Sequence, residues 1–300
     1  MIRAGIDIGT NTALMVVVEF HADGTFAVLD DVHELPRLGE GLSASGRICD
    51  DAIARAMESM QRFRDVLAPY PDVVVRCVAT SAMRESANGR NVASLLSGVL
   101  GHPIEIIDGA QEARLTFLGS VDASAVPTLM IDIGGGSTEY AIGANGIVTF
   151  STSIPYGAVK FTERFAFERP VSHDVISEAI SVVANSLAPC HEHFAIAEHC
   201  VGVAGTPVAL AMIDKGLASY DAQLLHGHRM NIHRIAELSA FLCSLTLAEL
   251  RSIPGLHERR ADIVPMGSVI LHASMHALGI QTIEARTTGL RYGAALAARV

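Results

Sequence analysis

The fold of this chain is decided by the stretch Leu129-Met-Ile-Asp-Ile-Gly-Gly-Gly-Ser-Thr-Glu-Tyr140. Its first apolar run is typical of a buried strand, and that run ends at the carboxylate of Asp132. Three glycines then form a tight turn, and a second apolar run follows. Near the N-terminus lies a related stretch, Ala4-Gly-Ile-Asp-Ile-Gly-Thr-Asn-Thr12, displaced by 125 residues when Asp7 is aligned with Asp132.

A second match at the same displacement pairs Val78-Ala-Thr-Ser81 with Val203-Ala-Gly-Thr206. Each of these stretches follows an apolar, β-branched run. Two matches in one register favour a chain built from duplicated domains. We therefore predict a first domain over residues 1–125 and a second over 126–287. A helix over 288–300 is expected to return and pack on the first domain.

The pattern of each half is a run of three strands followed by β/α units, which is typical of an α/β fold. In the first half we predict strands over 2–8, 14–20, 25–32, 73–79 and 104–107, with a turn at Asp23-Gly24. Helices are predicted over 50–67, capped by Asp50 or Asp51, and over 88–100 and 110–121. In the second half we predict strands over 129–133, 138–142, 147–151 and 199–203. Helices are predicted there over 157–165 and 172–187, and from 206 onward the chain is expected to be mostly helical.

Composition excludes several classes of protein. Half of the residues are hydrophobic and 18% are charged, as in a compact globular chain. The uncharged segment 263–280 contains proline, glycine and histidine, so we predict a buried helix there and no membrane span. The net charge of −10 argues against nucleic-acid binding. Five scattered cysteines without a CxxC motif, and an N-terminus without a signal-peptide pattern, predict a cytoplasmic protein.

The glycine turns predict phosphate binding. Successive N–H groups in such a turn form an anion-binding concavity, and the hydroxyls of Ser137 and Thr138 add donors. Asp132 repels a bare phosphate, so its expected role is to hold Mg²⁺ or a water, and Glu139 is placed to share that shell. A third candidate loop, residues 201–207, leads into a helix whose N-terminus favours anions. A Walker loop is excluded because no Gly-Lys-Ser/Thr follows the glycines.

Several motifs in order resemble the exopolyphosphatase/guanosine pentaphosphate phosphohydrolase (Ppx/GppA) family, in its short two-domain form. Besides the two glycine turns, the matching stretches are Arg37-Leu-Gly-Glu-Gly-Leu42, Ala79-Thr-Ser-Ala-Met-Arg-Glu85, Gly109-Ala-Gln-Glu-Ala-Arg-Leu115, Pro155-Tyr-Gly-Ala158, Gly202-Val-Ala-Gly-Thr206, Arg260-Ala-Asp262 and Gly289-Leu-Arg291. The resemblance implies duplicated ribonuclease H-like domains of the actin/sugar kinase/Hsp70 (ASKHA) class with an interdomain cleft. It also implies metal-dependent removal of terminal phosphate from polyphosphate.

The resemblance also implies roles for individual residues. Glu112 matches the catalytic base of the family, and with Asp132 and Glu139 it forms the expected catalytic set. Asp132 and Glu139 are the expected ligands of Mg²⁺ or another divalent cation. This sequence departs from the family pattern at Gln111, where a glutamate is usual, and at Tyr292, which also replaces a glutamate.

A larger set is expected to bind the substrate. The expected phosphate-binding residues are Asp7, Gly9, Thr10, Asn11, Thr12, Arg84, Gly134, Gly135, Gly136, Ser137, Thr138, Gly205 and Thr206. Arginine suits bidentate contacts with phosphate oxygens. A track for a longer polyanion is expected along Arg37, Arg90 and Arg260.

Other functions stay open on the residues alone. A pppGpp phosphohydrolase would use the same chemistry as an exopolyphosphatase. A polyphosphate or nucleotide sensor that binds without turnover is permitted by Gln111 and Tyr292, and a sugar or acetate kinase would need an acceptor pocket. The clusters at 190–193 and 199–200 lack regular zinc spacing, so we predict no zinc site. A homodimer is expected on base rates only.

Overall fold

The computed structural model describes residues 1–21, 25–165 and 168–298, and its contacts divide the chain into two compact units. Unit 1 comprises Met1–Gly119 together with Thr288–Val300, and unit 2 comprises Ser120–Thr287. The first division therefore falls after Gly119, where the sequence suggested residue 125. The C-terminal segment belongs to unit 1.

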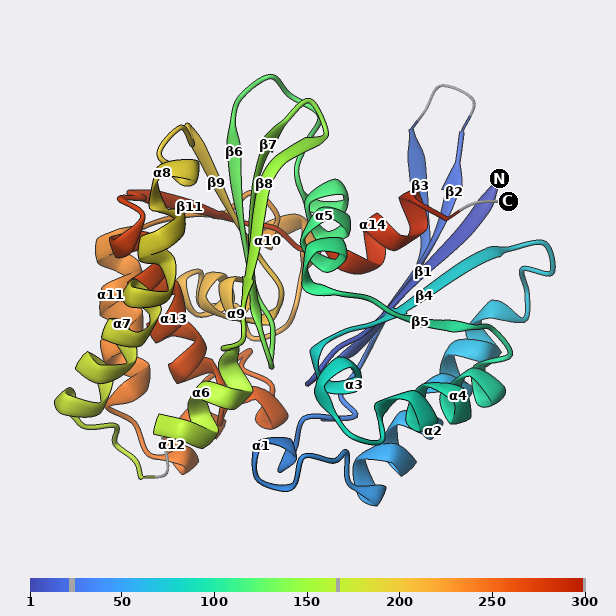
Figure 1. The fold of residues 1–300 in the computed structure, drawn as a ribbon, viewed down its shortest axis with the longest axis horizontal. Helices are drawn as coiled ribbons and strands as arrows, with labels where there is room; N and C mark the ends of the chain where they lie inside the picture. Colours follow the sequence, from blue (N-terminus) through green and yellow to red (C-terminus); the bar gives the residue numbers. More distant parts are fainter. Residues whose placement is uncertain (22–24, 166–167, 299–300) are drawn as a thin grey trace. The chain divides into compact units, whose positions relative to one another are not determined.

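Unit 1 is built on a five-stranded sheet in the order β3-β2-β1-β4-β5 (Figure 1). Its strands are β1 (Ile2–Ile8), β2 (Ala13–Phe20), β3 (Phe26–Glu34), β4 (Val74–Ala79) and β5 (Ile104–Ile106). The first three strands are antiparallel, whereas β4 and β5 run parallel to β1. The register places Asp7 opposite Leu14 on β2 and opposite Val78 on β4.

Helices cover both faces of the unit 1 sheet because its strands are apolar on both sides. Ile6, Ile8 and Met15 belong to the cluster that packs on α2 (Asp50–Leu67) and α4 (Gly89–Leu100). On the opposite face, Val78 packs on Leu115 of α5 (Gly109–Ser120) and on Leu290 of α14 (Leu290–Leu296). Figure 1 shows α14, in red, against the blue strands β1 and β2. Asp7 alternates with Ile6 and Ile8, so it lies on the face of α5 and α14.

Unit 2 is built on a six-stranded sheet in the order β10-β11-β9-β6-β7-β8. Its strands are β6 (Thr128–Ile133), β7 (Thr138–Ala144), β8 (Ile147–Ile154), β9 (His199–Val203), β10 (Arg229–Asn231) and β11 (Thr282–Ala285). Leu129, Ile131 and Tyr140 form one core with the helices on their side of the sheet. Asp132 and Glu139 alternate with these residues and therefore lie on the other face.

The two units repeat one topology, which confirms the predicted duplicated α/β fold of the ASKHA class. The order β3-β2-β1-β4-β5 in unit 1 corresponds to β8-β7-β6-β9-β11 in unit 2. Asp7 pairs with Val78, and Asp132 pairs with Val203, at the same displacement of 125 residues. The two glycine turns therefore occupy equivalent places at the ends of β1 and β6.

Shorter elements and the helices of unit 2 complete the chain. They are α1 (Leu42–Ser45), α3 (Ser81–Glu85), α6 (Ala158–Phe165), α7 (His173–Leu187), η1 (Ala188–Cys190), α8 (His191–Phe194), α9 (Gly205–Asp214), α10 (Ala222–Leu225), α11 (Ile232–Cys243), α12 (Leu247–Arg251), η2 (Glu258–Arg260) and α13 (Val264–Ala277). The predicted buried helix within 263–280 is α13, whose residues are almost all buried.

Some expectations were wrong at the level of elements. Asp50 and Asp51 do not cap α2, because they are its first helical residues and Cys49 stands at the N-cap. The strands β10 and β11 were missed, since each is only three or four residues long. The turn predicted at Asp23-Gly24 lies outside the described residues.

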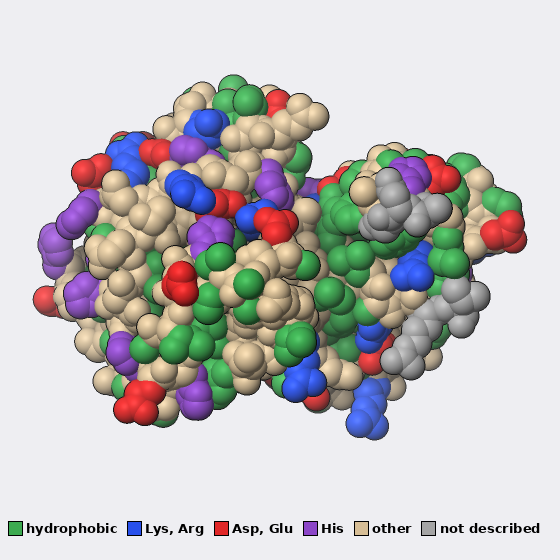
Figure 2. All heavy atoms as spheres, turned by 90° about the horizontal axis from the view of Figure 1, so that it is seen from above, with side chains coloured by type: hydrophobic (Ala, Val, Ile, Leu, Met, Phe, Trp, Pro, Cys, Tyr) green, Lys and Arg blue, Asp and Glu red, His purple; other side chains and the backbone are tan. Residues whose placement is uncertain are grey.

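The described surface carries both signs of charge. On the face shown in Figure 2, basic and acidic side chains are interspersed rather than gathered by sign. Exposed apolar side chains include Phe26, Val28 and Leu29 on the edge strand β3. Among the described residues, every helix is too short or too polar to span a bilayer.

Candidate phosphate-binding and catalytic residues

The turn after β1, which we call the first turn (Gly9–Thr12), holds its carbonyl groups in hydrogen bonds. The N–H of Gly9 donates to the carbonyl of Thr12 at 2.8 Å, and the carbonyls of Thr10 and Asn11 accept from the N–H groups of Gly39 (2.7 Å) and Arg37 (3.1 Å). Within the described chain, the N–H groups of Thr10 and Asn11 donate to no backbone carbonyl. These donors are therefore left for an anion.

The turn after β6, which we call the second turn (Gly134–Ser137), repeats this design. The N–H of Gly134 donates to the carbonyl of Ser137 at 3.1 Å, as Gly9 does to Thr12. Two N–H groups at the start of α6, those of Ala158 and Val159, donate to the carbonyls of Gly134 and Gly135, each at 2.9 Å. Among the described residues, the N–H groups of Gly135 and Ser137 have no backbone acceptor, so this turn also presents donors without competing carbonyls.

Close packing explains the glycine that precedes α6. A Cβ atom on Gly157 would lie 2.5 Å from the carbonyl carbon of Gly135, so any side chain there would push the second turn away from α6. Thr138 adds a further anchor, because its hydroxyl donates to the carbonyl of Tyr156 at 2.7 Å. The second turn is therefore fixed before any ligand arrives.

Glu112 lies in the first helical turns of α5 and is only 7% exposed. Its Oε2 accepts a hydrogen bond from Arg84 Nη1 at 2.9 Å. The same nitrogen donates to the carbonyl of Ile107, also at 2.9 Å. A side-chain hydrogen bond joins Glu112 to Thr80, which follows β4 and whose N–H binds the carbonyl of Ile8. Glu112 therefore lies where the carboxyl ends of β1, β4 and β5 meet.

Two opposing effects set the protonation of Glu112. Burial is the larger, and it raises the pKa of Glu112 above its usual range. The charge and hydrogen bond of Arg84 lower that pKa, as does the hydrogen bond from Thr80. The negative charge of Glu85 raises it again. A carboxyl with a raised pKa is better matched to accepting a proton near neutral pH.

Two acidic residues and a serine, which we call the acidic row, lie on three neighbouring strands of the second sheet, next to the second turn. Asp132 on β6 pairs with Glu139 on β7, and Glu139 pairs with Ser153 on β8. Asp132 and Glu139 are 7% and 1% exposed, and Ser153 Oγ donates to Glu139 Oε1 at 2.7 Å. Directly opposed residues of one sheet lie on the same face, so two carboxylates stand side by side.

Such a pair fits a hard divalent cation. Adjacent buried carboxylates repel each other unless a positive charge or a shared proton compensates. Mg²⁺ takes one or two carboxylates and completes its shell with water and substrate phosphates. Asp132 and Glu139 are the candidate ligands for such a cation, and within the described residues no cluster of three or more His, Cys, Asp or Glu side chains is placed to hold a metal.

The third candidate loop stands at the end of β9. Gly205 begins α9, and the guanidinium of Arg260 lies against it, so that a Cβ on Gly205 would approach Arg260 Nη1 to 2.5 Å. Thr206 is buried beside Gly267 of α13. A cation and a helix N-terminus therefore meet at this loop, as the sequence suggested for an anion site.

The remaining predicted residues differ in their surroundings and contacts. Arg37 has a left-handed φ of 55° and joins the first turn through its N–H. Arg90 is exposed on α4. Gln111 exchanges hydrogen bonds with Asp108 at the start of α5. Tyr292 donates its hydroxyl to Asp31 on β3 at 3.2 Å, a structural contact.

The sequence did not single out several contributing groups. Thr80 forms a hydrogen bond with Glu112, and Ser153 donates to Glu139. The carbonyl of Ile107 accepts from Arg84, the partner of Glu112. The repeat could have indicated Thr80, because it aligns with Gly205 of the third loop. Ser153 could have been found only from the pairing of β8 with β7.

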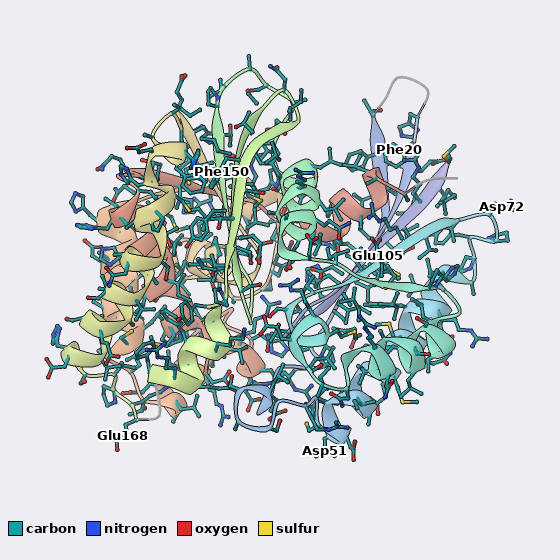
Figure 3. All side chains as sticks on the ribbon, viewed as in Figure 1. Phe20, Asp51, Asp72, Glu105, Phe150 and Glu168 are labelled. Carbon is teal, nitrogen blue, oxygen red and sulfur yellow. The ribbon has the colours of Figure 1, made fainter. Side chains whose placement is uncertain are left out.

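The histidine clusters take structural roles. His193 stacks on Phe150 with ring centroids 3.9 Å apart, and Figure 3 labels Phe150 on β8. His226 Nε2 lies 3.0 Å from Arg286 Nη1, and His228 pairs with Asp214 at 2.7 Å. All five cysteines are free.

Comparisons with known proteins agree on one family. The model of the Ppx/GppA phosphatase family matches residues 16–298. Exopolyphosphatase 2 of Mycobacterium tuberculosis is 31% identical over 281 residues, which cover 89% of this chain and 88% of that protein. A crystal structure of an exopolyphosphatase-like protein superposes with a TM-score of 0.90 at 29% identity, covering 99% and 98% of the two chains. An exopolyphosphatase from Cytophaga hutchinsonii gives 0.89 at 25% identity, covering 98% and 96%.

Proposed function

The chain belongs to the Ppx/GppA phosphatase family, and we propose that it is an exopolyphosphatase, which releases terminal phosphate from inorganic polyphosphate. The observation that carries the proposal is the repeated turn. In both units the carbonyls of the turn are held by neighbouring N–H groups, which leaves successive N–H donors for phosphate oxygens.

The reaction is the attack of water on the terminal phosphorus. Glu112 accepts the proton of that water, the new P–O bond forms, and the bond to the bridging oxygen breaks. The products are inorganic phosphate and a chain shorter by one phosphate, and the proton passes from Glu112 to solvent or product. N–H donors of the turns stabilise charge on the phosphoryl oxygens. A divalent cation held by Asp132 and Glu139 would supply charge neutralisation.

Substitution of the base tests this assignment. Glu112→Gln keeps the shape of the side chain but cannot accept a proton, so we expect kcat to fall by roughly 10²-fold or more while KM changes little. Phosphate release from polyphosphate with Mg²⁺ is the measurement. Glu105→Gln is the matched control, because Glu105 is an exposed carboxylate on β5, labelled in Figure 3, and pairs with Arg76.

The substrate is decided by a parallel assay. The relative from Mycobacterium tuberculosis is named for polyphosphate, which favours that substrate. Faster release of phosphate from pppGpp than from polyphosphate would replace this assignment with the other activity of the family. Tight polyphosphate binding without release of phosphate from either compound would identify a sensor. The free cysteines suit a reducing compartment, so the cytoplasm is the proposed location.

A further inference from the structure

The chain passes between the units after Gly119 and again after Thr287, and one arginine of unit 2 is bonded beside both crossings. Arg286 directly precedes Thr287, and its Nη2 donates to Asp122 at 3.0 Å, close to the first crossing. Its Nη1 lies 3.0 Å from Nε2 of His226, in the loop between α10 and β10. His226 also contacts the second crossing directly, because its Nδ1 lies 3.0 Å from Oγ1 of Thr287.

The partners of His226 fix which of its ring nitrogens carries the proton. A guanidinium is always protonated and only donates, so Nε2 must accept from Arg286 Nη1. In the neutral ring the proton then lies on Nδ1, which donates to the hydroxyl of Thr287. The backbone N–H of Thr287 lies 3.5 Å from Nδ1, and it has no lone pair to meet there in this tautomer. The neutral ring is therefore bonded on both sides only as its Nδ1–H tautomer.

Protonation of His226 is incompatible with these contacts. The added proton would lie on Nε2 and face an N–H of Arg286 Nη1, so that two donors and two positive charges would meet across 3.0 Å. Arg286 would also lose an acceptor, and its buried Nε already lacks one among the described residues. The imidazole ring must therefore leave Arg286 when it takes up a proton.

The charges that face His226 come from two segments, with Asp122 after α5 and with Glu284 and Arg286 at the end of β11. Burial is the largest effect and lowers the pKa of His226, and the charge of Arg286 lowers it further. The charges of Asp122 and Glu284 raise that pKa, but both carboxylates are paired with Arg286. The pKa of His226 therefore lies below its usual value of 6.5, and the neutral ring is favoured at neutral pH.

We propose that His226 is a pH-dependent latch on the second crossing. The neutral ring bonds Arg286 and Thr287, whereas the protonated ring releases the chain around Thr287. Because the bonded ring has the lowered pKa, the latch is fully present above pH 6.5 and is progressively lost as the pH falls below that value. The latch acts within unit 2 and is independent of the proposed phosphatase activity.

Three variants distinguish a titrating latch from a histidine that only fills space. His226→Gln offers an amide oxygen to Arg286 and an amide N–H to Thr287, and it does not titrate. His226→Ala removes both bonds. His233→Gln is the control, because His233 is an exposed histidine of α11 whose side chain has no bond among the described residues.

The test applies two measurements to the full chain. Long-range ¹H–¹⁵N NMR identifies the tautomer of His226, whose signals are assigned by their loss in His226→Gln, and we expect the neutral ring to carry its proton on Nδ1. Hydrogen exchange with mass spectrometry, corrected for the intrinsic rate at each pH, reports the opening of residues 287–290.

The variants should separate in their pH dependence. In wild type and in His233→Gln, protection of 287–290 should fall by roughly 5-fold between about pH 8 and about pH 5, the effect of about one net hydrogen bond. Protection in His226→Gln should stay at the high level at both pH values, and protection in His226→Ala should stay at the low level.

Two outcomes would overturn the latch. An Nε2–H tautomer of the neutral ring would contradict the bond from Arg286, and it is observed in the wild-type chain whatever the stability of the variants. A fall of protection in His226→Gln as large as in wild type would show that another group causes the pH dependence.

Discussion

Glu139 stands at the position in unit 2 that Leu14 occupies in unit 1, because each pairs with the aspartate near the end of the first strand. The next strand also differs, since Ser153 pairs with Glu139 whereas His33 pairs with Leu14. The duplication therefore preserves the backbone but places an acidic row only in unit 2. Unit 1 instead carries the buried Glu112, the proposed base.

Ser153 is predicted to position a cation ligand. Its hydroxyl donates to Glu139 Oε1 at 2.7 Å, and such outer partners typically contribute about 10- to 100-fold to metal affinity. We expect Ser153→Ala to raise the Mg²⁺ concentration needed for half-maximal phosphate release by roughly 10-fold, with kcat at saturating Mg²⁺ nearly retained. Ser151→Ala, two residues earlier on β8, is the control. Equal Mg²⁺ requirements in both variants would show that Ser153 has no such role.

Helix α14 is held to the edge strand β3 by side chains that converge on Asp31. Arg291 donates to both carboxylate oxygens at 2.9 Å, and Tyr292 donates to one of them at 3.2 Å. Tyr292 also packs among Val16 and Val18. The departure from the family pattern at Tyr292 therefore serves the docking of α14 within unit 1.

The contacts of Asp31 predict a pH dependence of stability. Burial alone would raise the pKa of Asp31, but hydrogen bonds from His33 and Arg291 lower it from 3.8 to about 2. Because the folded-state pKa is depressed, this contribution is present above pH 3.8 and is lost as the pH falls towards 2.

Asp31→Asn tests that dependence. We expect it to reduce stability at neutral pH by about 1 kcal/mol, a value discounted for the exposure of the edge strand. The difference in Tm from wild type should close as the pH approaches 2, and denaturation followed by circular dichroism would measure it. Asp65→Asn on α2 is the control, since Asp65 accepts an exposed bond from Gln61, its one side-chain bond among the described residues. A difference in Tm between Asp31→Asn and wild type that stays constant with pH would contradict the pairing of Asp31 with Arg291 and His33.

Helix α5, which carries Glu112, begins with a reciprocal hydrogen-bonded pair that includes Gln111, the residue that departs from the family pattern. Asp108 Oδ1 accepts from the N–H of Gln111 at 2.8 Å, and Gln111 Oε1 accepts from the N–H of Asp108 at 3.3 Å. This reciprocal pair satisfies two donors at the helix start. Gln111 thus supports the element that positions Glu112 without supplying a second carboxylate.

Across the whole molecule, the chain passes between the units twice, after Gly119 and after Thr287. A buried ion-pair network of unit 2 lies beside both passages, because Arg286 Nη2 binds Glu284 at 2.9 Å and Asp122 at 3.0 Å. Within unit 1, α5 and α14 meet through glycine, since a Cβ on Gly119 would lie 2.3 Å from the nitrogen of Gly293. The ion pairs of Arg286 thus hold the chain near both crossings within unit 2. The close contact of Gly119 with Gly293 holds α5 against α14 within unit 1.

Removal of Arg286 is predicted to destabilise unit 2. Glu284 and Arg286 are 7% and 8% exposed, and removal of Arg286 leaves Glu284 paired with Arg229 at 3.1 Å and His199 at 3.2 Å. We expect Arg286→Met to lower the unfolding free energy by about 2 kcal/mol, the value of a lost hydrogen bond between charged groups. Calorimetry with hydrogen exchange would measure it, with protection falling first in β9 and β11. Arg234→Met is the control, because the Arg234 side chain is itself 42% exposed in its pairs with Asp214 and Glu237. An equal loss of stability in both variants would contradict the prediction.

Much of this architecture was predictable from local sequence. The strands β1, β6 and β9, the two turns and the α5 helix follow from apolar runs, glycines and the 125-residue repeat. The strands β10 and β11 were not predictable, because three or four residues are too few to show a period. The cap of α2 was not either, because aspartate is favoured both at the N-cap and in the first helical turn.

The sequence by itself determined where each glycine turn lies and which carboxylate stands near the end of each strand, since glycine geometry and strand alternation act over a few residues. Only the tertiary structure decided the partners. Arg84 meets Glu112, and Ser153 meets Glu139, through the docking of helices and the register of strands far apart in the chain. The same long-range packing assigned Tyr292 to α14, because a side chain acquires its acceptor only after the sheet and helix that carry them have come together.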